Sequence, residues 1–462
     1  MDVVSFFAGC GGLDLGFEQA GFNVVWANEF DKSIHATYEK NHAGTILCKD
    51  DINNISPKDI PDCDGFIGGP PCQSWSVGGK QKGLDDERGQ LFLTYIGMIK
   101  AKMPKFFVIE NVKGLLDEKF KDVFEYFLTQ LEEIGYDVKY RLVDAVDYEV
   151  PQNRERVFLV GFRHDLGIDY HFPQPTANKS LTLKDVIGDI TTTPIPCEEN
   201  ESMTDSNSYY NGKFGPYYYR GNRRRSWDKP SFTIHATGYN TPLHPSSPSM
   251  IYNAHEDWSF IKGKYREYRR LTVRECARIQ TFPDNFEIDC PNIIDAYKMI
   301  GNAVPVRLSE IIAISIRETL EAAKNERQLI RGNIKPDDRV LVGYYKGYSH
   351  LKIITHQGFY YVRADGRKGS LEIEDLQPLP RLLLLHSKQR MHLYELTNVE
   401  PKYYGKEYIE RLGFLPSGDT YIGLGFDPSF SYKLKPIGID KDSIQLKDQY
   451  APYVTTFQEL LR

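Results

Sequence analysis

The chain has 462 residues and a net charge of −6, and 41% of its residues are hydrophobic. This length allows two or three domains with sizeable cores, and the composition excludes a disordered or collagen-like chain. Seven cysteines without regular spacing or a CxxC pair argue against a disulfide framework or a zinc site and fit a reducing cytoplasm. No basic leader is present and no apolar run approaches the ~20 residues of a membrane span. We therefore expect a cytoplasmic protein that uses no membrane, and any nucleic-acid surface must be a local patch on this acidic chain.

The first segment reads as a strand at 3–7, a glycine-rich turn at 8–12 and an amphipathic helix. Bare backbone at a strand end lets a nucleotide-like ligand approach, although such a turn is equally common as a purely structural feature. The next predicted strand, 24–28, ends at Glu29. An acid there is placed to accept hydrogen bonds from ribose hydroxyls, and it could equally be the N-terminal acid of a helix. Asp51 and Ile52 follow near a third strand end.

Further apolar runs predict strands at 65–67, 106–109, 138–143 and 157–162, and a stripe with helical spacing predicts a helix at 120–134. Strands that alternate with helices predict an α/β fold with a mostly parallel sheet covered on both faces. Ligands of such sheets bind at the carboxyl ends of the strands. The residues that fall at those ends are Gly11, Glu29, Asp51, Cys72 and Glu110.

The segment 68–76 reads Gly-Gly-Pro-Pro-Cys-Gln-Ser-Trp-Ser and directly follows an apolar run. Two prolines fix the backbone ahead of Cys72, and the paired glycines allow a sharp turn off the strand. A buried structural cysteine is the alternative for any single thiol. Because an acid and two arginines elsewhere supply what a reactive thiolate needs, Cys72 is the candidate nucleophile.

From about 175 to 266 the alternation lapses into an irregular region that is rich in tyrosine and arginine. Basic residues interleaved with aromatics suit phosphate and base-edge contacts, while a solvated charged loop is the alternative. Thr272, with Glu275 three residues on, predicts a capped helix start, and another helix runs from about 305 to 327. Beyond 331, strands predicted at 340–345, 351–355, 359–362 and 382–385, with a hairpin turn at Asp365-Gly366, indicate a separate β-rich domain.

Taken together, these motifs resemble a DNA (cytosine-5) methyltransferase of bacterial restriction-modification systems over residues 1–325. The matching blocks occur in the family's order: 6–12, Glu29, 51–52, the Pro-Pro-Cys-Gln block, 88–92, 110–112, Gln152-Asn153-Arg154-Glu155-Arg156, 270–283 and 301–305. Two departures are Ser5, where the family often has Asp, and Lys49-Asp50 ahead of Asp51, where Gly-Asp is usual. Both flank the cofactor pocket and neither removes a catalytic group. The resemblance implies a Rossmann-like S-adenosylmethionine-dependent methyltransferase domain with a smaller target-recognition domain.

The reaction needs a thiolate because C5 of cytosine is a poor nucleophile until C6 has been attacked. We assign that attack to Cys72, the acid at the base N3 to Glu110, and the grip on the base O2 to Arg154 and Arg156, with a surface ion-pair strand as the alternative for the arginines. The resemblance implies S-adenosyl-L-methionine as the cofactor, without a metal. The expected cofactor contacts are Phe7, Ala8, Gly9, Gly11, Gly12, Glu29, Phe30, Asp51, Ile52, Leu91 and Asn302.

A base inside a duplex is out of reach, so we expect base flipping, with 74–88 as a mobile loop that closes over the base. The segments 220–227 and 232–238 resemble the recognition region of HaeIII-type methyltransferases, which modify GGCC, and arginine is the side chain that reads guanine. The expected contacts to double-stranded DNA are Gln73, Ser76, Arg88, Arg220, Arg223, Arg224 and Arg225, with Gln73 or Ser76 entering the gap that the base leaves.

We expect a catalytic domain at 1–174 and 267–330, a target-recognition region at 175–266 and an accessory domain at 331–462. A cognate restriction endonuclease would act on the same site without direct contact, and we expect a monomer. Two alternatives remain: an RNA cytosine-5 methyltransferase, and a non-catalytic DNA-binding protein on the same fold. For the accessory domain, the acid-x-Lys spacing at 400–402, with Glu374 or Asp375 upstream, suggests a nuclease, but Pro401 fits a central strand poorly. An accessory DNA contact or self-association is the simpler role, and its tyrosines could be core, surface or a base-stacking platform.

Overall fold

The computed structural model describes residues 1–71, 87–176, 180–199, 201–203, 205–333, 335, 337–346, 348–367, 370–387, 391–397, 402–412, 419–432 and 452–460. The chain divides into two compact units. The first comprises Met1–Arg163 and Asp169–Thr319, and the second His164–Ile168 and Leu320–Arg462. The region 175–266 therefore lies in the first unit, and its separation as a domain of its own stays a prediction.

The first unit is built on a seven-stranded sheet of order β3-β2-β1-β4-β5-β7-β6. Its strands are β1 Asp2–Phe6, β2 Asn23–Asn28, β3 Ile46–Cys48, β4 Gly65–Gly68, β5 Phe106–Val112, β6 Tyr136–Asp144 and β7 Glu155–Arg163. From β3 to β5 all neighbours are parallel, and β7 runs antiparallel to both β5 and β6. The mostly parallel α/β arrangement predicted from the sequence is confirmed.

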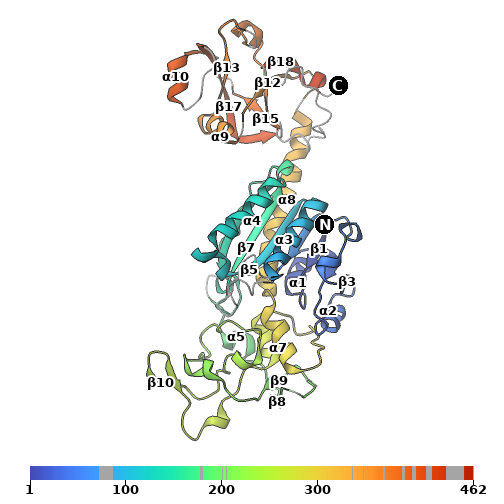
Figure 1. The fold of residues 1–462 in the computed structure, drawn as a ribbon, viewed down its shortest axis with the longest axis vertical. Coiled ribbons are helices and arrows are strands. Elements are labelled where there is room, and N and C mark those ends of the chain that lie inside the picture. Colours follow the sequence, from blue (N-terminus) through green and yellow to red (C-terminus); the bar gives the residue numbers. More distant parts are fainter. Residues whose placement is uncertain are drawn as a thin grey trace. The chain divides into compact units, whose positions relative to one another are not determined.

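Helices cover both faces of this sheet (Figure 1). Two adjacent residues of β5 show this, because each packs against helices on a different face. Consecutive strand residues point to opposite faces. Phe107 packs in a core with α3 (Glu87–Lys102) and α4 (Lys121–Glu133). Phe106 lies on the other face, where its ring is stacked 6.5 Å from Phe17 of α1 (Gly12–Gln19). The predicted apolar stripe of α4 is therefore core packing, as expected.

The remaining elements of the first unit are short, apart from helix α8. They are α2 His35–Asn41, α5 Leu183–Ile187, β8 Ile195–Cys197, β9 Ser208–Tyr210, β10 Ile251–Ala254, β11 Asp257–Ser259, α6 Val273–Ile279, α7 Ile293–Asn302 and the start of α8 Val306–Asn333. The predicted cap is present: Thr272 Oγ1 accepts from Glu275 N at 3.0 Å, and Glu275 Oε2 accepts from Thr272 N at 2.8 Å. The described residues between 175 and 266 are largely irregular, as the sequence indicated.

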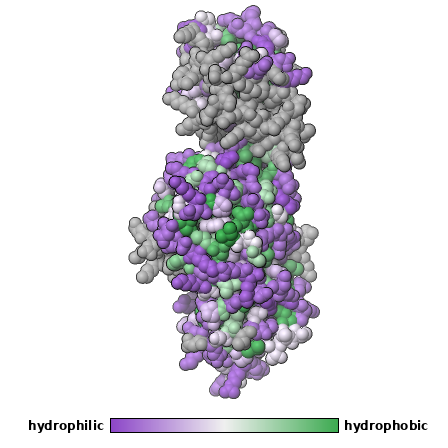
Figure 2. All heavy atoms as spheres, turned by 90° about the vertical axis from the view of Figure 1, so that its right-hand side faces the viewer, coloured by the Kyte–Doolittle hydropathy of each residue, from purple (hydrophilic) through white to green (hydrophobic). Residues whose placement is uncertain are grey.

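One described stretch, Ile293–Ala323, is long and apolar enough to cross a membrane by length and composition alone. It consists of α7 and the start of α8, and 72% of its most apolar window is buried inside the fold. Core helices of a globular unit give this result. The surface of the first unit in Figure 2 is mostly hydrophilic, with hydrophobic side chains gathered in the middle of the visible face.

The second unit has a mixed sheet of order β13-β17-β15-β14-β12-β18, with β16 paired to β17. Its elements are β12 Arg339–Tyr344, α9 Tyr348–Gln357, β13 Phe359–Arg363, β14 Leu382–His386, β15 Met391–Leu396, β16 Lys402–Gly405, α10 Lys406–Arg411, β17 Thr420–Tyr432, β18 Tyr453–Thr456 and α11 Phe457–Leu460. The β-rich character is confirmed. Tyr345 and Tyr360 are buried in its core, whereas Tyr403 is 51% exposed.

Two predictions for the second unit are wrong. The strand predicted at 351–355 is part of helix α9, because Leu351 and Ile354, three residues apart, pack together into the core of the unit. The Asp365-Gly366 turn does not connect a hairpin, because β13 pairs antiparallel with β17 far along the chain. Residues 400 and 401 of the nuclease motif lie outside the described residues.

Candidate active site

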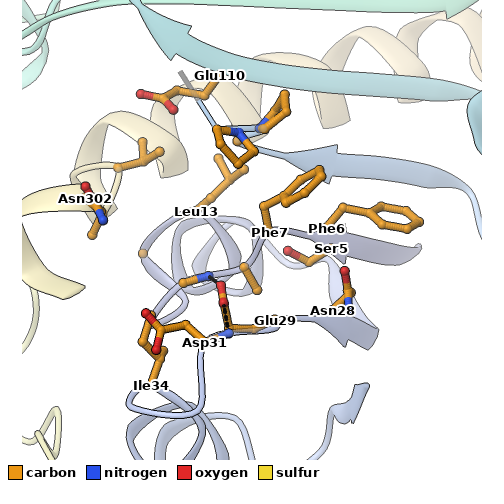
Figure 3. A pocket seen from close by; sticks show the side chains of 18 of the residues that line it. Ser5, Phe6, Phe7, Leu13, Asn28, Glu29, Asp31, Ile34, Glu110 and Asn302 are labelled. Carbon is orange, nitrogen blue, oxygen red and sulfur yellow. Dashed lines mark hydrogen bonds between the residues drawn. The ribbon is translucent and has the colours of Figure 1, made fainter. Parts of the chain in front are cut away.

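A cavity of about 430 Å³ lies at the carboxyl ends of the parallel strands of the first unit. Glu110 stands at one end of it and Glu29 and Asp31 at the other, with Phe7 and Leu13 between (Figure 3). Nearly all the cofactor contacts predicted from the sequence line this cavity: Phe7, Ala8, Gly9, Gly12, Glu29, Phe30, Asp51, Ile52, Leu91 and Asn302. Gly11 does not line it. Gly11 instead precedes α1 in a left-handed conformation, with φ +85°.

The turn after β1 has a strained backbone. Phe7, a bulky residue, has φ +53°, and Gly9 has φ +57°. An added Cβ at Gly9 would meet no atom within 4 Å, so the backbone there faces open space. Non-glycine residues avoid this region, and such conformations cluster at ligand sites. The turn therefore has the form of a cradle in which a ligand can approach the main chain.

Glu29, at the end of β2, is fixed by backbone donors. Its Oε2 accepts from Gly9 N at 2.8 Å, and its Oε1 accepts from Asp31 N at 2.7 Å. Burial raises the pKa of Glu29, and these two N–H groups offset part of the rise. Asp31 is in turn paired with Lys298 of α7. This rim can present carboxylate oxygens to the hydroxyls of a ribose.

The other predicted cofactor contacts come from separate elements. Asp51 caps a short 3₁₀ turn, because its Oδ1 accepts from Asn53 N at 2.9 Å. Phe30 is 62% exposed and offers a free ring at the mouth of the cavity. Asn302 ends helix α7 and Leu91 lies on α3. Residues far apart in the sequence are thus brought to one cavity by the order of the strands.

At the other end of the cavity, Glu110 forms an ion pair with Arg156. The distance from Arg156 Nε to Glu110 Oε1 is 3.0 Å, and both side chains are largely buried. The register of β5 and β7 places them close together, since Asn111 pairs with Val157 and Val112 with Arg156. Burial raises the pKa of Glu110, and the charges of Arg156 and Arg154 lower it in part. A carboxyl with a raised pKa can carry a proton to a substrate atom.

Arg154 also lines the cavity, but its guanidinium is largely committed to the protein. Nη1 donates to Ile234 O at 3.0 Å, and Nη2 donates to Gly301 O and Ala303 O at 2.9 and 3.0 Å. The side chain is 1% exposed. Arg154 therefore joins the start of β7 to two other segments, one of which belongs to the arginine-rich region.

The predicted recognition arginines differ in their surroundings. Arg223 is buried, with its guanidinium 4.2 Å from the Tyr217 ring, and Arg224 donates to Pro245 O at 3.0 Å. Arg225 stacks on Phe232 at 4.0 Å, and Arg220 is exposed. Burial, with the positive charges of Arg223, Arg154 and Arg156, lowers the pKa of nearby His235 to about 4. The Glu110 end of the cavity is thus surrounded by arginines, and the nearby His235 is neutral at pH 7.

Three predicted residues fall outside the description. Cys72, Gln73 and Ser76 lie outside the described residues, as does most of the predicted loop 74–88, and of Arg88 only the backbone, in α3, is described. The chain that leads to Cys72 is described as far as Pro71. Pro70 and Pro71 line the cavity, and Asn111 Nδ2 donates to Pro70 O at 3.2 Å. The roles assigned to all these residues stay predictions.

The residues of the pocket region that sequence reasoning missed include Asp14, Asp31, Met299 and His42. The first three line the cavity, and His42 lies buried behind the glycine turn. The signal for Asp14 was an acid between Leu13 and Leu15 on the apolar first turn of a helix, where burial of the carboxylate requires partners. The other three had no comparable signal because long-range packing brings them to the site.

Comparisons with known proteins agree with the geometry. Residues 1–318 match the family of C-5 cytosine-specific DNA methylases. Type II methyltransferase M.NgoPII of Neisseria gonorrhoeae is 48% identical over 329 residues, which is 70% of this chain and 96% of that protein. M.FnuDI of Fusobacterium nucleatum is 45% identical over 339 residues, 72% of this chain and 98% of that protein. A crystal structure of a prophage-encoded E. coli protein, described as a DNA modification methyltransferase, superposes with a TM-score of 0.54 at 23% identity and covers 70% of this chain and 99% of that one.

The sheet order and the cavity at the carboxyl ends of its strands define the first unit as a Rossmann-like methyltransferase fold, as predicted. Within that class, the family match over residues 1–318 and the similar type II methyltransferases point to one family. The chain belongs to the C-5 cytosine-specific DNA methylase family.

Proposed function

We propose that this protein transfers a methyl group to C5 of a cytosine in double-stranded DNA, as the modification enzyme of a type II restriction-modification system. The observation that carries this proposal is the single cavity with the Glu110–Arg156 pair at one end and the glycine turn and Glu29 at the other. One end suits a cytosine ring and the other suits a nucleoside cofactor. The type II relatives support the same system for this chain.

Each catalytic role follows from the chemistry of the base. Cys72 adds to C6, which makes C5 nucleophilic, and leaves again when the C5 proton is lost. Negative charge that develops on the ring is relieved by Glu110, which donates a proton to N3. Arg156, with its remaining N–H groups, holds the base O2 and keeps Glu110 oriented. Arg154 fixes the wall behind them through its three carbonyl partners.

We propose S-adenosyl-L-methionine as the cofactor, and the lining of the cavity supports this choice. When bound, it supplies an electrophilic methyl group on sulfonium. The open space at Gly9 admits the cofactor against the backbone, Glu29 binds the ribose, and the exposed ring of Phe30 offers a surface for the adenine. The chemistry requires no metal, and no cluster of three or more His, Cys, Asp or Glu suited to a metal occurs among the described residues.

GGCC is the proposed target site, on the resemblance of 220–227 and 232–238 to HaeIII-type recognition regions. Arg225 stacks on Phe232, and Ile234, two residues further on, is hydrogen-bonded to Arg154 of the cavity. A guanine-reading side chain within this segment would therefore act next to the flipped cytosine. Base flipping with closure of 74–88, and the DNA contacts of Gln73, Ser76 and Arg88, belong to the same proposal.

The proposal also covers the partner enzyme, the location in the cell and the roles of the domains. A cognate restriction endonuclease would cut the same site when it is unmethylated, without touching this protein. We propose a cytoplasmic monomer with a catalytic part at 1–174 and 267–330, a target-recognition part at 175–266 and an accessory part at 331–462.

The decisive experiment is the transfer of tritiated methyl groups from S-adenosyl-L-methionine to a panel of DNA duplexes and to tRNA. Wild type is compared with Cys72→Ser and with Cys48→Ser as a matched control. We expect incorporation into GGCC duplexes, loss of it in Cys72→Ser, and full activity in Cys48→Ser. Each altered base pair in the site should cost about 1–3 kcal/mol of discrimination.

Other results would change the proposal in defined ways. Incorporation into tRNA but into no duplex would replace DNA by RNA as the substrate and keep the chemistry. Incorporation into DNA at a different sequence would remove GGCC only. Binding of duplex DNA without any methyl transfer would favour a DNA-binding protein on this fold.

A further inference from the structure

A buried histidine lies directly behind the glycine turn. His42 follows helix α2, and its side chain is fully buried. An added Cβ at Gly11 would lie 2.0 Å from His42 Nε2. Residue 11 must therefore be glycine both for its φ of +85° and because the imidazole occupies the space of a side chain. The ring is in contact with the turn and sets how far the turn can move back from the cavity.

The imidazole is itself fixed by two helices. Its Nδ1 lies 3.2 Å from Glu18 Oε1 of α1, and its ring is stacked on Tyr38 of α2 with the centroids 4.4 Å apart. Tyr38 OH donates to Asp14 Oδ2 at 2.6 Å. Ser5 Oγ of β1 donates to Asp14 Oδ1, also at 2.6 Å. A network of buried polar groups thus joins β1, α1 and α2 beneath the turn.

We propose that His42 is a positioning residue for the cofactor, because its imidazole, braced by Glu18 and Tyr38, holds the glycine turn in the conformation that the cofactor needs. This inference rests on the proposed cofactor and adds a residue to its site. The turn presents Gly9 to the cavity, and Gly9 N–H donates to Glu29 Oε2 at 2.8 Å. A shift of the turn would therefore move a wall of the cavity and the proposed ribose-binding carboxylate together.

The charge on the ring follows from its surroundings. Burial alone would lower the pKa of His42, but the hydrogen bond to Glu18 and the charges of Asp14 and Glu18 raise it above the ordinary value. The groups that face the ring are Glu18 and Asp14 from α1, the Tyr38 phenol from α2 and the Cys10 backbone from the turn. The raised pKa favours the imidazolium form of His42, with the Glu18 carboxylate as its hydrogen-bonded partner.

The sign of the pH dependence is fixed by this raised pKa. The imidazolium is present at pH values below the pKa of His42 in the folded protein and is lost as the pH rises through it. Cofactor affinity should be highest below that pKa and should weaken above it. Glu18→Gln removes the hydrogen-bonded charge, so the pH at which affinity weakens should move down.

The test is calorimetric titration of S-adenosyl-L-methionine into the full-length protein without DNA, across a pH series. We expect His42→Gln to raise the Kd for the cofactor about tenfold, while kcat at saturating cofactor stays within about threefold. Glu18→Gln should fold like wild type and shift the pH midpoint of the Kd downward. His171→Gln, a histidine whose side chain is 80% exposed, should match wild type in both measurements.

Several outcomes would overturn the assignment. A folded His42→Gln protein with wild-type Kd, or one that loses kcat at saturating cofactor with Kd unchanged, excludes a positioning role. If His42→Gln does not fold, an unshifted midpoint in Glu18→Gln has the same consequence. Cofactor binding without methylation of DNA would remove the proposed substrate and leave this inference standing, whereas a wild type that binds no cofactor overturns both.

Discussion

The Glu110–Arg156 pair illustrates the conflict that a buried acid must resolve. Burial favours the neutral carboxyl, which can donate a proton, while Arg156 favours the carboxylate. The net effect is a raised pKa, so the proton is held more tightly than in water. A proton donor to the base N3 needs this property. Arg156, 3.0 Å away, keeps the group aligned without removing its proton affinity.

Replacing Glu110 by Gln tests this role. The amide keeps the size of the side chain but supplies no acidic proton, so we expect kcat to fall about 10²–10⁴-fold. Cofactor affinity should not change, because Glu110 stands at the opposite end of the cavity from Glu29 (Figure 3). Steady-state methyl transfer at saturating DNA and cofactor measures kcat, and calorimetry measures the affinity for the cofactor. The matched control is Glu155→Gln, the exposed neighbour that pairs with Lys113, and a kcat loss below about threefold in Glu110→Gln would refute the assignment.

Arg154 should act on stability more than on chemistry. Arg154→Met would leave the Ile234 and Gly301 carbonyls without their guanidinium donor in a buried site. Each buried group left unpaired costs about 1–3 kcal/mol, so we expect the free energy of unfolding to fall by about 2–4 kcal/mol. Urea denaturation measures this, with Lys139→Met on exposed β6 as the control. An unchanged unfolding free energy would mean that water satisfies those carbonyls as well as Arg154 does.

At the scale of elements, the arginine-rich segment contains arginines that are held by contacts within the protein and arginines that we propose to contact DNA. Arg223 and Arg224 are tied to Tyr217 and to Pro245 O. The Arg225 guanidinium lies 4.0 Å from the centre of the Phe232 ring, and an arginine can make a planar, bidentate contact to a base edge. Arg220 is exposed at the surface. The different surroundings of Arg225 and Arg220 suggest that the two residues contribute differently to DNA binding.

This division is tested by Arg225→Gln and Arg220→Gln. Loss of a guanine contact at Arg225 should reduce the preference for GGCC over single-mismatch duplexes by about 10-fold or more, with little effect on mismatched DNA. Loss of a phosphate contact at Arg220 should weaken binding to all duplexes alike and reduce the slope of log K against log salt by about one. Fluorescence anisotropy across a salt series measures both. The reverse pattern would exchange the two roles.

The central sheet was readable from the sequence because its strands are short apolar runs separated by helical periodicity, and the register then brought Glu110 and Glu29 to one cavity. Prediction failed where contacts between distant segments decide. The run at 351–355 has the composition of a strand, yet Leu351 and Ile354 pack on a helical spacing. The partner of β13 lies in β17, and no local turn signal could indicate it. His42 was missed for the same reason, since only the fold brings it against Gly11.

At the scale of the whole molecule, the cavity lies in the first unit, and the family match includes no part of the second unit except His164–Ile168. Residues 1–318 match the family, and M.NgoPII is covered over 96% of its length by 70% of this chain. The second unit has its own sheet and its own hydrophobic core. A unit with its own core can fold alone. Methyl transfer should therefore not depend on the second unit.

A chain that ends after Asn333, which keeps all of α8, tests this independence. Because every described residue of the cavity remains, we expect kcat and the KM for the cofactor within about threefold of the full chain, a difference below about 0.7 kcal/mol. The affinity for DNA decides the role of the removed part. A salt dependence equal to that of the full chain would mean that the second unit makes no phosphate contact, whereas a slope lower by about one per lost contact would assign it an accessory DNA surface. A truncated chain that folds, as judged by a cooperative urea transition, but has lost methyl transfer would contradict the independence of the first unit.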